Sequence, residues 1–339
     1  MIDVLVVDDS AFMRKVLTDI LNEDPSINVI ETASNGNEAI EKTALLQPDV
    51  ITMDVEMPGI NGIKTVRRIM KDYPTPIIMV SAYTKEGAEK TIKALEAGAI
   101  DFVEKPGGTI SLKIREVKQD ILKKVKIAKK ANIPYTKKEA GLIKKPIHKL
   151  KMKTLIIIAA STGGPRAIYL LLSQLPRNFP SSIIVVQHMP KGFTGAFAKR
   201  LNQNCKIKVR EAKDGDILKD GEVLIAPGDF HLELNNSNEI KLNKKPPFHG
   251  IRPSADITMN SASDAFDGNI IGVVLSGMGK DGAIGVRKIK RKGGIIIAQD
   301  RETSVVHGMP KAALETGFVD HILPLSKITG KLTEIVNNV

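Results

Sequence analysis

The chain has 339 residues, which is long for a single hydrophobic core and predicts two domains. Hydrophobic residues make up 42% of it and charged residues 26%, a composition typical of globular proteins. The only cysteine, Cys205, excludes an intramolecular disulfide and a cysteine-based metal site, and nothing near it in the sequence favours a nucleophile. The first residues do not resemble a signal peptide, and no apolar run approaches the roughly 20 residues of a membrane-spanning helix. We therefore expect a cytoplasmic protein without membrane insertion.

The net charge of +12 is concentrated in one segment. Residues 123–153 contain twelve lysines and one acidic residue, Glu139, so this segment carries +11 and the rest of the chain +1. The pattern predicts a solvated lysine-rich linker, with attraction to an acidic partner as the alternative. Aromatic residues are only 4% of the chain, which leaves few to stack on bases, and no helix-turn-helix pattern is present. We therefore expect no nucleic-acid partner.

Residues 1–122 alternate between short apolar runs and amphipathic segments. This alternation predicts a parallel β-sheet covered by helices on both faces, the doubly wound α/β class. A final helix from about residue 111 is expected to run on into the lysines before Asn132, Pro134 and Gly141 end it. The predicted strands are 3–7, 28–32, 50–54, 77–81 and 101–103, and the other predicted helices lie near 11–21, 36–45, 62–71 and 87–97.

Polar residues follow these strands at their carboxyl ends, where parallel α/β sheets bind ligands. Asp8 and Asp9 follow the run VLVV, and Asp54 follows VITM. Each alone would be a solvated loop residue or a cap, but clustered carboxylates need a cation, and oxygen ligands without His or Cys favour Mg²⁺. Ser81 and Lys105 lie at other strand ends. Carboxylates, Mg²⁺, a hydroxyl and an amine together are suited to a phosphoryl group.

The motifs VDDS, MDVEMPGINGI, VSA and FVEKP occur in this order, and with them the segment resembles the receiver domain of two-component response regulators. The resemblance implies a flavodoxin-like fold and phosphorylation of Asp54, which adds roughly −1.5 to −2 charge. It also implies that Asp9, Asp54 and the backbone carbonyl of Glu56 bind Mg²⁺, with Asp8 helping through water.

The same resemblance implies a phosphorylation switch at the other strand ends. Ser81 and Phe102 match the hydroxyl and aromatic residues that report phosphorylation, and Lys105 matches the lysine that contacts the phosphoryl group. Pro106 matches the family's usual cis-proline. The added charge is expected to draw Ser81 inward and to change one surface of the domain.

Residues 154–339 again alternate strands and helices and predict a second doubly wound domain, of Rossmann-like α/β class. The segment HLELNNSNEIKL, residues 231–242, predicts an inserted β-hairpin. The predicted strands are 155–159, 183–186, 223–226, 270–275 and 295–298, and the predicted helices lie near 166–174, 193–202, 256–265, 283–290 and 310–316.

The stretch LIIIAASTGGPRAI, residues 155–168, predicts a buried strand that turns sharply into a helix. Gly163 and Gly164 allow the turn, and the following proline suits the first turn of a helix. Ser161 would then lie at the mouth of a crevice, facing the amide groups of a helix N-terminus. The simpler interpretation, for Ser161 or Thr162 alone, is a helix N-cap.

Two more residues follow predicted strands of this domain. His188 follows IIVVQ, and Asp281 follows IIGVVLSG. If these strands are neighbours, Ser161, His188 and Asp281 converge as nucleophile, base and orienting carboxylate. The glycine-rich turn that contains Met278 offers a backbone N–H for an oxyanion.

Simpler interpretations apply here too. Asp281 suits the first turn of a helix, and His188 suits a hydrogen-bonded position under a loop. Position at a strand end favours His188 as the base. On composition alone, three other histidines could fill the role: His231, His249 and His307.

The motifs ASTGGP, VQHMP, APGDFHLEL, RPSADI, LSGMGKDGA and the region from AQD to HGMPKAA span nearly the whole second domain. With them the domain resembles the catalytic domain of the chemotaxis protein-glutamate methylesterase family. The resemblance matches four residues to the nucleophile, the base, the orienting acid and the backbone oxyanion donor, in this order: Ser161, His188, Asp281 and Met278.

Two residues depart from the usual family pattern. Ala159 stands where glycine is usual, and Lys280 stands where a neutral amide is common. The first is expected to tighten the turn and the second to shift Asp281 modestly. Neither change removes a reacting group.

The resemblance implies hydrolysis of glutamate γ-methyl esters on methyl-accepting chemotaxis receptors, with release of methanol, and deamidation of receptor glutamines. Both reactions would pass through a serine acyl-enzyme, without a cofactor. A chemotaxis histidine kinase would phosphorylate Asp54, and this would loosen an unphosphorylated receiver that covers the crevice. We expect a monomer.

Three other functions stand as alternatives: a receiver-regulated binding protein without catalysis, a DNA-binding response regulator, and a serine hydrolase with an unrelated substrate. The intact Ser161, His188 and Asp281 argue against the first, and the missing recognition helix argues against the second. Only the family motifs argue against the third.

Overall fold

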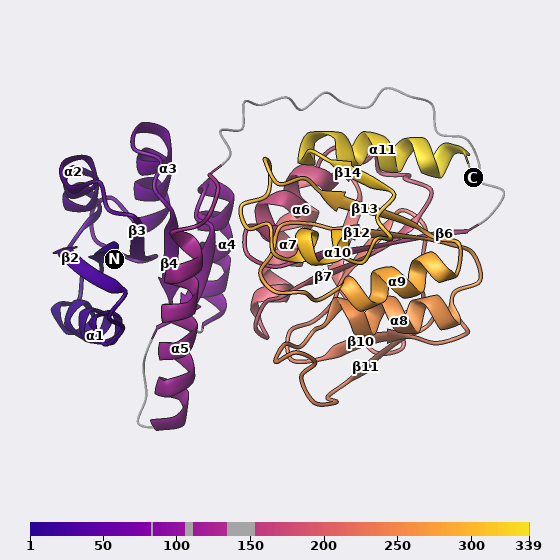
Figure 1. The fold of residues 1–339 in the computed structure, drawn as a ribbon, viewed down its shortest axis with the longest axis horizontal. Helices are drawn as coiled ribbons and strands as arrows, with labels where there is room; N and C mark the ends of the chain where they lie inside the picture. The colour runs from indigo at the N-terminus through magenta and orange to yellow at the C-terminus, as the bar shows by residue number, and fades with distance from the viewer. Residues whose placement is uncertain (83, 106–110, 134–152, 339) are drawn as a thin grey trace. The chain divides into compact units, whose positions relative to one another are not determined.

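The structure is a computed structural model, and it describes residues 1–82, 84–105, 111–133 and 153–338. The chain divides into two compact units, Met1–Ile133 and Pro134–Val339 (Figure 1). Pro106 and most of the predicted linker, residues 134–152, lie outside the described residues, so the linker's bounds stay a prediction. In the described part of the chain, no helix is long and apolar enough to cross a bilayer.

The first unit is built on a five-stranded parallel sheet of order β2-β1-β3-β4-β5, as in flavodoxin-like folds. This confirms the predicted doubly wound class. The last helix continues into the first lysines of the predicted linker, as expected. The elements are β1 (Ile2–Val7), α1 (Ala11–Asn22), β2 (Ile27–Ala33), α2 (Gly36–Leu46), β3 (Val50–Asp54), α3 (Gly62–Asp72), β4 (Ile77–Ser81), α4 (Lys85–Ala97), β5 (Asp101–Glu104) and α5 (Ser111–Ala128).

Four helices of this unit begin at a side chain that accepts a hydrogen bond from the third helical N–H. The caps of α1, α2, α3 and α4 are Ser10, Asn35, Asn61 and Thr84. Each cap satisfies a backbone donor that the helix itself leaves unpaired. Because every cap follows a strand by a few residues, the polar strand ends and the helix starts lie at the same edge of the sheet.

The second unit is built on a seven-stranded parallel sheet of order β14-β13-β12-β6-β7-β9-β8, with a separate antiparallel pair, β10 and β11. This confirms the second α/β sheet and the inserted hairpin. The elements are β6 (Thr154–Ala160), α6 (Gly164–Leu172), β7 (Ser182–Gln187), α7 (Phe193–Asn204), β8 (Lys208–Glu211), β9 (Glu222–Ile225), β10 (His231–Leu234), β11 (Ile240–Asn243), α8 (Ala255–Ala265), β12 (Asn269–Val274), α9 (Ala283–Arg291), β13 (Ile295–Gln299), α10 (Met309–Leu314), β14 (His321–Leu323) and α11 (Leu325–Asn338).

Strand β6 lies at the centre of this sheet, between β12 and β7. All residues of β6 and β7 are buried, because α6, α7 and α11 pack on one face and α8, α9 and α10 on the other (Figure 1). The chain leaves β6 toward β7 on one side and returns later to β12 on the other. The carboxyl end of β6 is therefore a topological switch point, the place where open α/β sheets bind ligands.

Candidate active site

The turn after β6 presents Ser161 at this switch point. Gly163 is the N-cap of α6 and has φ 76°, a left-handed conformation, and no side chain caps the helix. A Cβ on Gly164 would lie 2.1 Å from Gln187 Oε1, so only glycine fits there. The N-cap interpretation of Ser161 and Thr162 is therefore wrong. Ser161 is left half-buried, and its backbone N–H donates to Ser276 O at 3.1 Å.

His188 and Asp281 lie at the ends of the two strands that flank β6. His188 directly follows β7, and its N–H donates to Ala160 O at 3.1 Å. Asp281 lies between β12 and α9. His188 Nε2 and Asp281 Oδ2 are 2.8 Å apart, and the side chains are 12% and 2% exposed. The expectation that the three strands are neighbours is confirmed.

The carboxylate of Asp281 is also held by the start of α8. Ser254 Oγ donates to Oδ1 at 2.6 Å, Asp256 N–H donates to Oδ1 at 3.0 Å, and Ala255 N–H donates to Oδ2 at 2.6 Å. Burial opposes the charge of Asp281, but His188 and these donors outweigh it and lower the pKa of the carboxyl. Asp281 is thus an ionised acceptor that fixes the proton of His188 on Nε2.

The side chain of Ser161 lies apart from His188, the candidate base, in this structure. Among the described residues, no hydrogen bond joins Ser161 Oγ to His188, a common situation in a site without substrate. The turn at Met278 lies beside the serine, because a Cβ on Gly277 would be 2.9 Å from Ser161 Cβ. The Met278 N–H donates to no group within the described part of the chain, so it is available to a ligand.

The other candidate histidines lie in different surroundings. His231 is fully buried, and its Nε2 lies 3.1 Å from Pro246 O. His307 pairs through its backbone with Gly277, and His249 is in a left-handed conformation. Among the histidines of the described residues, it is His188 that forms a hydrogen bond with Asp281, and none of these three does.

Buried polar residues that sequence reasoning passed over hold the site together. Gln187 Nε2 donates to the carbonyls of Ser161 and His188, at 3.0 and 3.2 Å. Ser276 Oγ donates to Thr162 O at 2.8 Å and accepts from Val306 N at 3.0 Å. The available signal was a polar residue at the end of an otherwise apolar strand, as in VQHMP and VVLSG.

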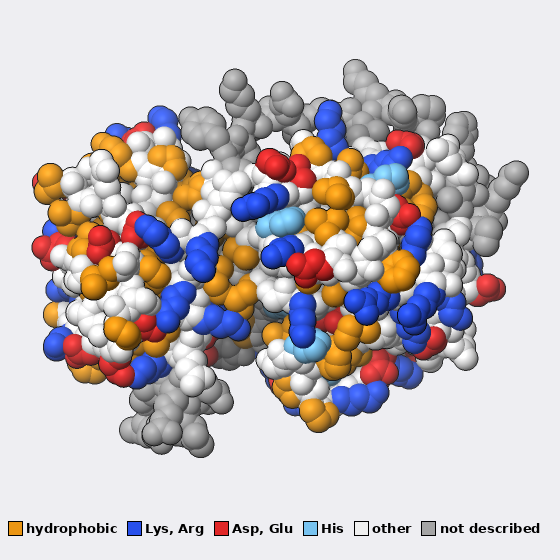
Figure 2. All heavy atoms as spheres, viewed as in Figure 1, with side chains coloured by type: hydrophobic (Ala, Val, Ile, Leu, Met, Phe, Trp, Pro, Cys, Tyr) orange, Lys and Arg blue, Asp and Glu red, His pale blue; other side chains and the backbone are white. Residues whose placement is uncertain are grey.

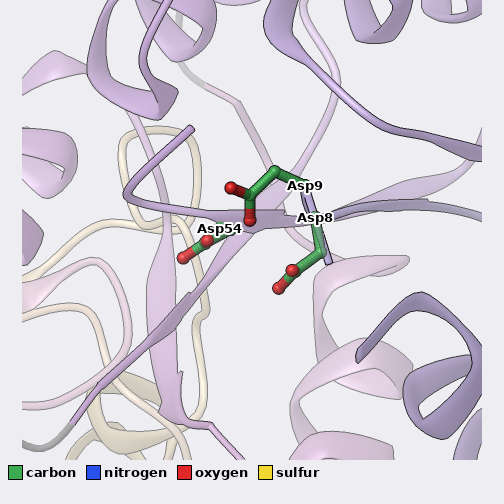
Figure 3. A group of neighbouring side chains, drawn as sticks. All are labelled: Asp8, Asp9 and Asp54. Atoms are coloured by element: carbon green, nitrogen blue, oxygen red, sulfur yellow. The ribbon is translucent and has the colours of Figure 1, made fainter. Parts of the chain in front are cut away.

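The first unit carries a separate group of charged residues at the ends of β1, β3 and β5. The carboxylates of Asp8, Asp9 and Asp54 offer oxygen atoms that lie within 4.8 Å of one another (Figure 3). Lys105 Nζ lies 3.0 Å from Asp8 Oδ2 and 2.8 Å from Asp54 Oδ2. An all-oxygen donor set of this size fits Mg²⁺.

Burial shapes the protonation of this group. It raises the pKa of Asp54 despite the pairing with Lys105. It opposes the charge of Lys105, but Asp54 and Asp8 outweigh it and raise the pKa of the amine. The side chain of Glu56 is exposed and pairs with Lys90 at 2.6 Å, so its carboxylate is engaged outside the group of Asp8, Asp9 and Asp54.

Ser81 is buried at the end of β4, and Phe102 is buried within the neighbouring strand β5. The hydroxyl of Ser81 forms a hydrogen bond with Thr91 Oγ1 in α4, at 2.7 Å. It is therefore directed to α4 in this structure. The sequence analysis does not include Thr91. Its position on the buried face of α4, where apolar residues are usual, is the signal that could identify it.

A receiver-type sheet with clustered carboxylates at its strand ends and an α/β unit with a serine at its switch point define a response regulator with an enzymatic effector. The family model for the response regulator receiver domain matches residues 4–115. The model for the CheB methylesterase matches residues 156–332. The chain belongs to the CheB methylesterase family.

Individual relatives match nearly the whole chain. A protein-glutamate methylesterase/protein-glutamine glutaminase of Pyrococcus abyssi is 51% identical over 338 residues, covering 96% of this chain and 91% of the relative. A protein of the same description from Thermotoga maritima is 47% identical over 342 residues, covering 99% and 98%. The crystal structure of the T. maritima CheB methylesterase catalytic domain has a TM-score of 0.52 at 45% identity, covering 54% of this chain and 98% of that chain.

Proposed function

We propose that this chain hydrolyses glutamate γ-methyl esters on methyl-accepting chemotaxis receptors and deamidates receptor glutamines. Membership of the CheB methylesterase family supports this, as do the names of relatives that match nearly the whole chain. Both reactions transfer an acyl group to water, so one nucleophile serves both. The supporting observation for the catalytic roles is the 2.8 Å pair of His188 Nε2 and Asp281 Oδ2 at the strands flanking that of Ser161.

In the proposed mechanism Ser161 Oγ attacks the ester carbonyl while His188 takes its proton. Because Nε2 donates to Asp281, the nitrogen that takes the proton is Nδ1. The oxyanion accepts a hydrogen bond from Met278 N–H, and the carboxylate of Asp281 stabilises the imidazolium.

The acyl-enzyme then forms and breaks down. The bond between the acyl carbon and the methoxy oxygen breaks, and His188 returns the proton to that oxygen, so methanol leaves. A glutamine side chain loses ammonia in the same way. A water molecule then gives a proton to His188 and attacks the acyl carbon. The bond between that carbon and Ser161 Oγ breaks, and His188 returns the proton to Oγ, which releases glutamate and restores Ser161. These steps use protein groups and water alone.

The proposed regulation acts through Asp54, which accepts a phosphoryl group from a chemotaxis histidine kinase. Asp9, Asp54 and the Glu56 carbonyl would hold Mg²⁺, with Asp8 through water, and the ion would neutralise charge on the phosphoryl group when bound. Lys105, which lies 2.8 Å from Asp54 Oδ2, would contact the phosphoryl oxygens.

The phosphoryl group would then redirect Ser81. Its hydroxyl would leave Thr91 for the phosphoryl oxygens, and Phe102 would follow into the space behind it. We propose that the enzyme works as a monomer in the cytoplasm, with no nucleic-acid partner.

The decisive experiment measures methanol release from membranes that contain methylated receptors. Phosphorylated wild-type protein should release methanol, and Ser161→Ala should release none above background. Ser237→Ala, at an exposed turn of the same unit, is the matched control and should behave as wild type. Equal release by wild type and Ser161→Ala would reject Ser161 as nucleophile. Hydrolysis of small esters without release from receptors would instead favour a serine hydrolase with another substrate.

A further inference from the structure

A basic cavity lies on the surface formed by α8 and α9. Its volume is about 440 Å³. Figure 2 shows a group of Lys and Arg side chains over these two helices. The residues that line the cavity are Asn260, Ile284, Arg287, Lys288, Arg291 and Lys292.

Most of the positive charge in this cavity is not neutralised by the protein. Lys288 pairs with Asp264. Arg287, Arg291 and Lys292 form no ion pair with any residue in the described part of the chain. Like charges this close together repel one another, so they lower stability unless an anion binds there.

The cavity also contains an apolar surface. Ile284 is 45% exposed and lies on the outer face of α9, among the positive charges of the cavity. An aliphatic side chain among positive charges can contact an apolar side chain of a ligand while the charges bind its carboxylates. A ligand that satisfies both features carries carboxylates and an apolar side chain.

Both helices that line the cavity begin close to Asp281, the proposed catalytic acid. Helix α9 begins two residues after Asp281, and Ala255 N–H at the start of α8 donates to the same carboxylate. Ile284 lies in the first turn of α9 and Lys292 just beyond its last, about 12 Å further along the axis. The two helices that line the cavity are thus the ones whose starts flank the carboxylate of Asp281.

We propose that this cavity is the docking site for an acidic segment of the receptor polypeptide beside the ester being cleaved. The inference rests on the proposed function, whose product is itself a glutamate carboxylate on the same polypeptide. Nucleic acid is disfavoured, because the cavity offers an aliphatic side chain and no aromatic ring for a base. The cavity would lower KM for receptors without taking part in the reaction of the ester.

The test reverses two charges with Arg287→Glu/Arg291→Glu in the full-length, phosphorylated protein. The matched control is Arg177→Glu/Lys206→Glu, which makes the same charge change at exposed positions outside both helices. KM for methylated receptor membranes should rise on the order of tenfold in the cavity variant and stay near wild type in the control. The turnover of a small uncharged ester, 4-nitrophenyl acetate, should be unchanged in both variants. Thermal unfolding shows whether both variants are folded.

Direct binding separates this inference from the proposed function. Fluorescent poly-L-glutamate should bind wild type and the control variant, with a strong dependence on salt, and should bind the cavity variant at least tenfold more weakly. An unchanged KM together with unchanged poly-L-glutamate binding would overturn the docking site even if wild type releases methanol. Preferential binding of duplex DNA or inorganic phosphate at the cavity would also overturn it. Absence of methanol release by wild type would reject only the proposed function.

Discussion

A second buried carboxyl lies beside Asp281. Asp256 is fully buried, its Oδ1 accepts from Gly285 N–H at 2.7 Å, and its Oδ2 has no hydrogen-bond partner among the described residues. Burial, together with the charge of Asp281, raises the pKa of Asp256 to about 7. The N–H of the same residue donates to Asp281 Oδ1, so the backbone of Asp256 helps to position Asp281, the proposed catalytic acid, while its side chain accepts from the start of α9.

The raised pKa of Asp256 predicts a dependence of stability on pH. Between the ordinary value of 3.8 and about 7 the folded protein holds a proton on this group that the unfolded chain has lost. The contribution of this group to the free energy of unfolding therefore falls as pH rises through this window. Asp256→Asn keeps the shape and cannot ionise, so it should gain stability relative to wild type from pH 4 to pH 7. Thermal melts of both proteins at several pH values check this, and a difference that is constant with pH would contradict it.

Substitution of Gln187 is expected to reduce activity, although Gln187 is not one of the proposed reacting groups. Its Nε2 donates to the carbonyls of Ser161 and His188, and the side chain is only 2% exposed. Gln187→Met keeps the volume of the side chain and removes both hydrogen bonds, so Ser161 and His188 lose the donor that they share. We expect kcat to fall about tenfold or more and the free energy of unfolding to fall by about 1–3 kcal/mol.

Gln174 offers the matched control for this prediction. Its Nε2 donates to Leu170 O at 2.7 Å near the end of α6, away from the site. Gln174→Met should keep kcat on methylated receptors. If Gln187→Met retains wild-type kcat as well, the two hydrogen bonds of Gln187 have no role in positioning Ser161 and His188.

At the scale of the elements, α4 contacts Ser81, the hydroxyl of the proposed phosphorylation switch. The Ser81–Thr91 hydrogen bond of 2.7 Å holds the proposed switch hydroxyl against α4. Thr91→Val removes it at nearly constant volume, which should release Ser81 toward the phosphoryl position. We expect Mg²⁺-dependent binding of beryllofluoride, a phosphoryl analogue, to tighten up to about fivefold, the equivalent of roughly 1 kcal/mol. Isothermal titration calorimetry measures this affinity.

Thr43→Val is the control for the switch. Thr43 is buried in α2, and its Oγ1 donates to Ala39 O at 2.6 Å, so the same substitution removes a helical hydrogen bond away from Ser81. It should leave beryllofluoride affinity unchanged. Unchanged or weaker binding by Thr91→Val would show that the hydrogen bond does not oppose the switch.

The elements that the sequence predicts well are those with strong apolar patterns and clear ends. The runs before Asp8, Asp54, Ser161 and His188 form strands within one or two residues of the predicted bounds. The start of α4 lies two residues before the prediction, because Thr84 caps it and the polar residues that follow give no periodic signal.

Some elements are set by tertiary contacts instead. Strands β8 and β14 were not predicted, because they are three or four residues long, carry polar side chains and pair only at the edges of the sheet. Helix α11 was also missed, although its buried face packs against α6. The positions of predicted strand ends identify Ser161, His188 and Asp281 as candidate site residues. The sequence does not identify Gln187 and Asp256, because a single buried polar residue has no periodic signature.

At the scale of the whole molecule, the two sites differ in their need for a metal. The cluster of Asp8, Asp9 and Asp54 lies in the first unit, and Ser161 and His188 lie in the second. The proposed phosphoryl site brings together carboxylates whose charge Mg²⁺ would neutralise, whereas the His188–Asp281 pair is satisfied by protein donors. Regulation and hydrolysis should therefore respond differently to removal of Mg²⁺.

Chelation separates the two functions in one assay. With Mg²⁺ and acetyl phosphate, wild type should release methanol faster than it does without the phosphodonor, because Asp54 becomes phosphorylated. Addition of EDTA should abolish this increase and leave the basal rate unchanged, since no step of the proposed mechanism at Ser161 uses an ion. Asp54→Asn should show the same basal rate with and without acetyl phosphate. A basal rate of Asp54→Asn that falls on chelation would contradict the argument, because it would place a metal requirement in the hydrolytic unit itself.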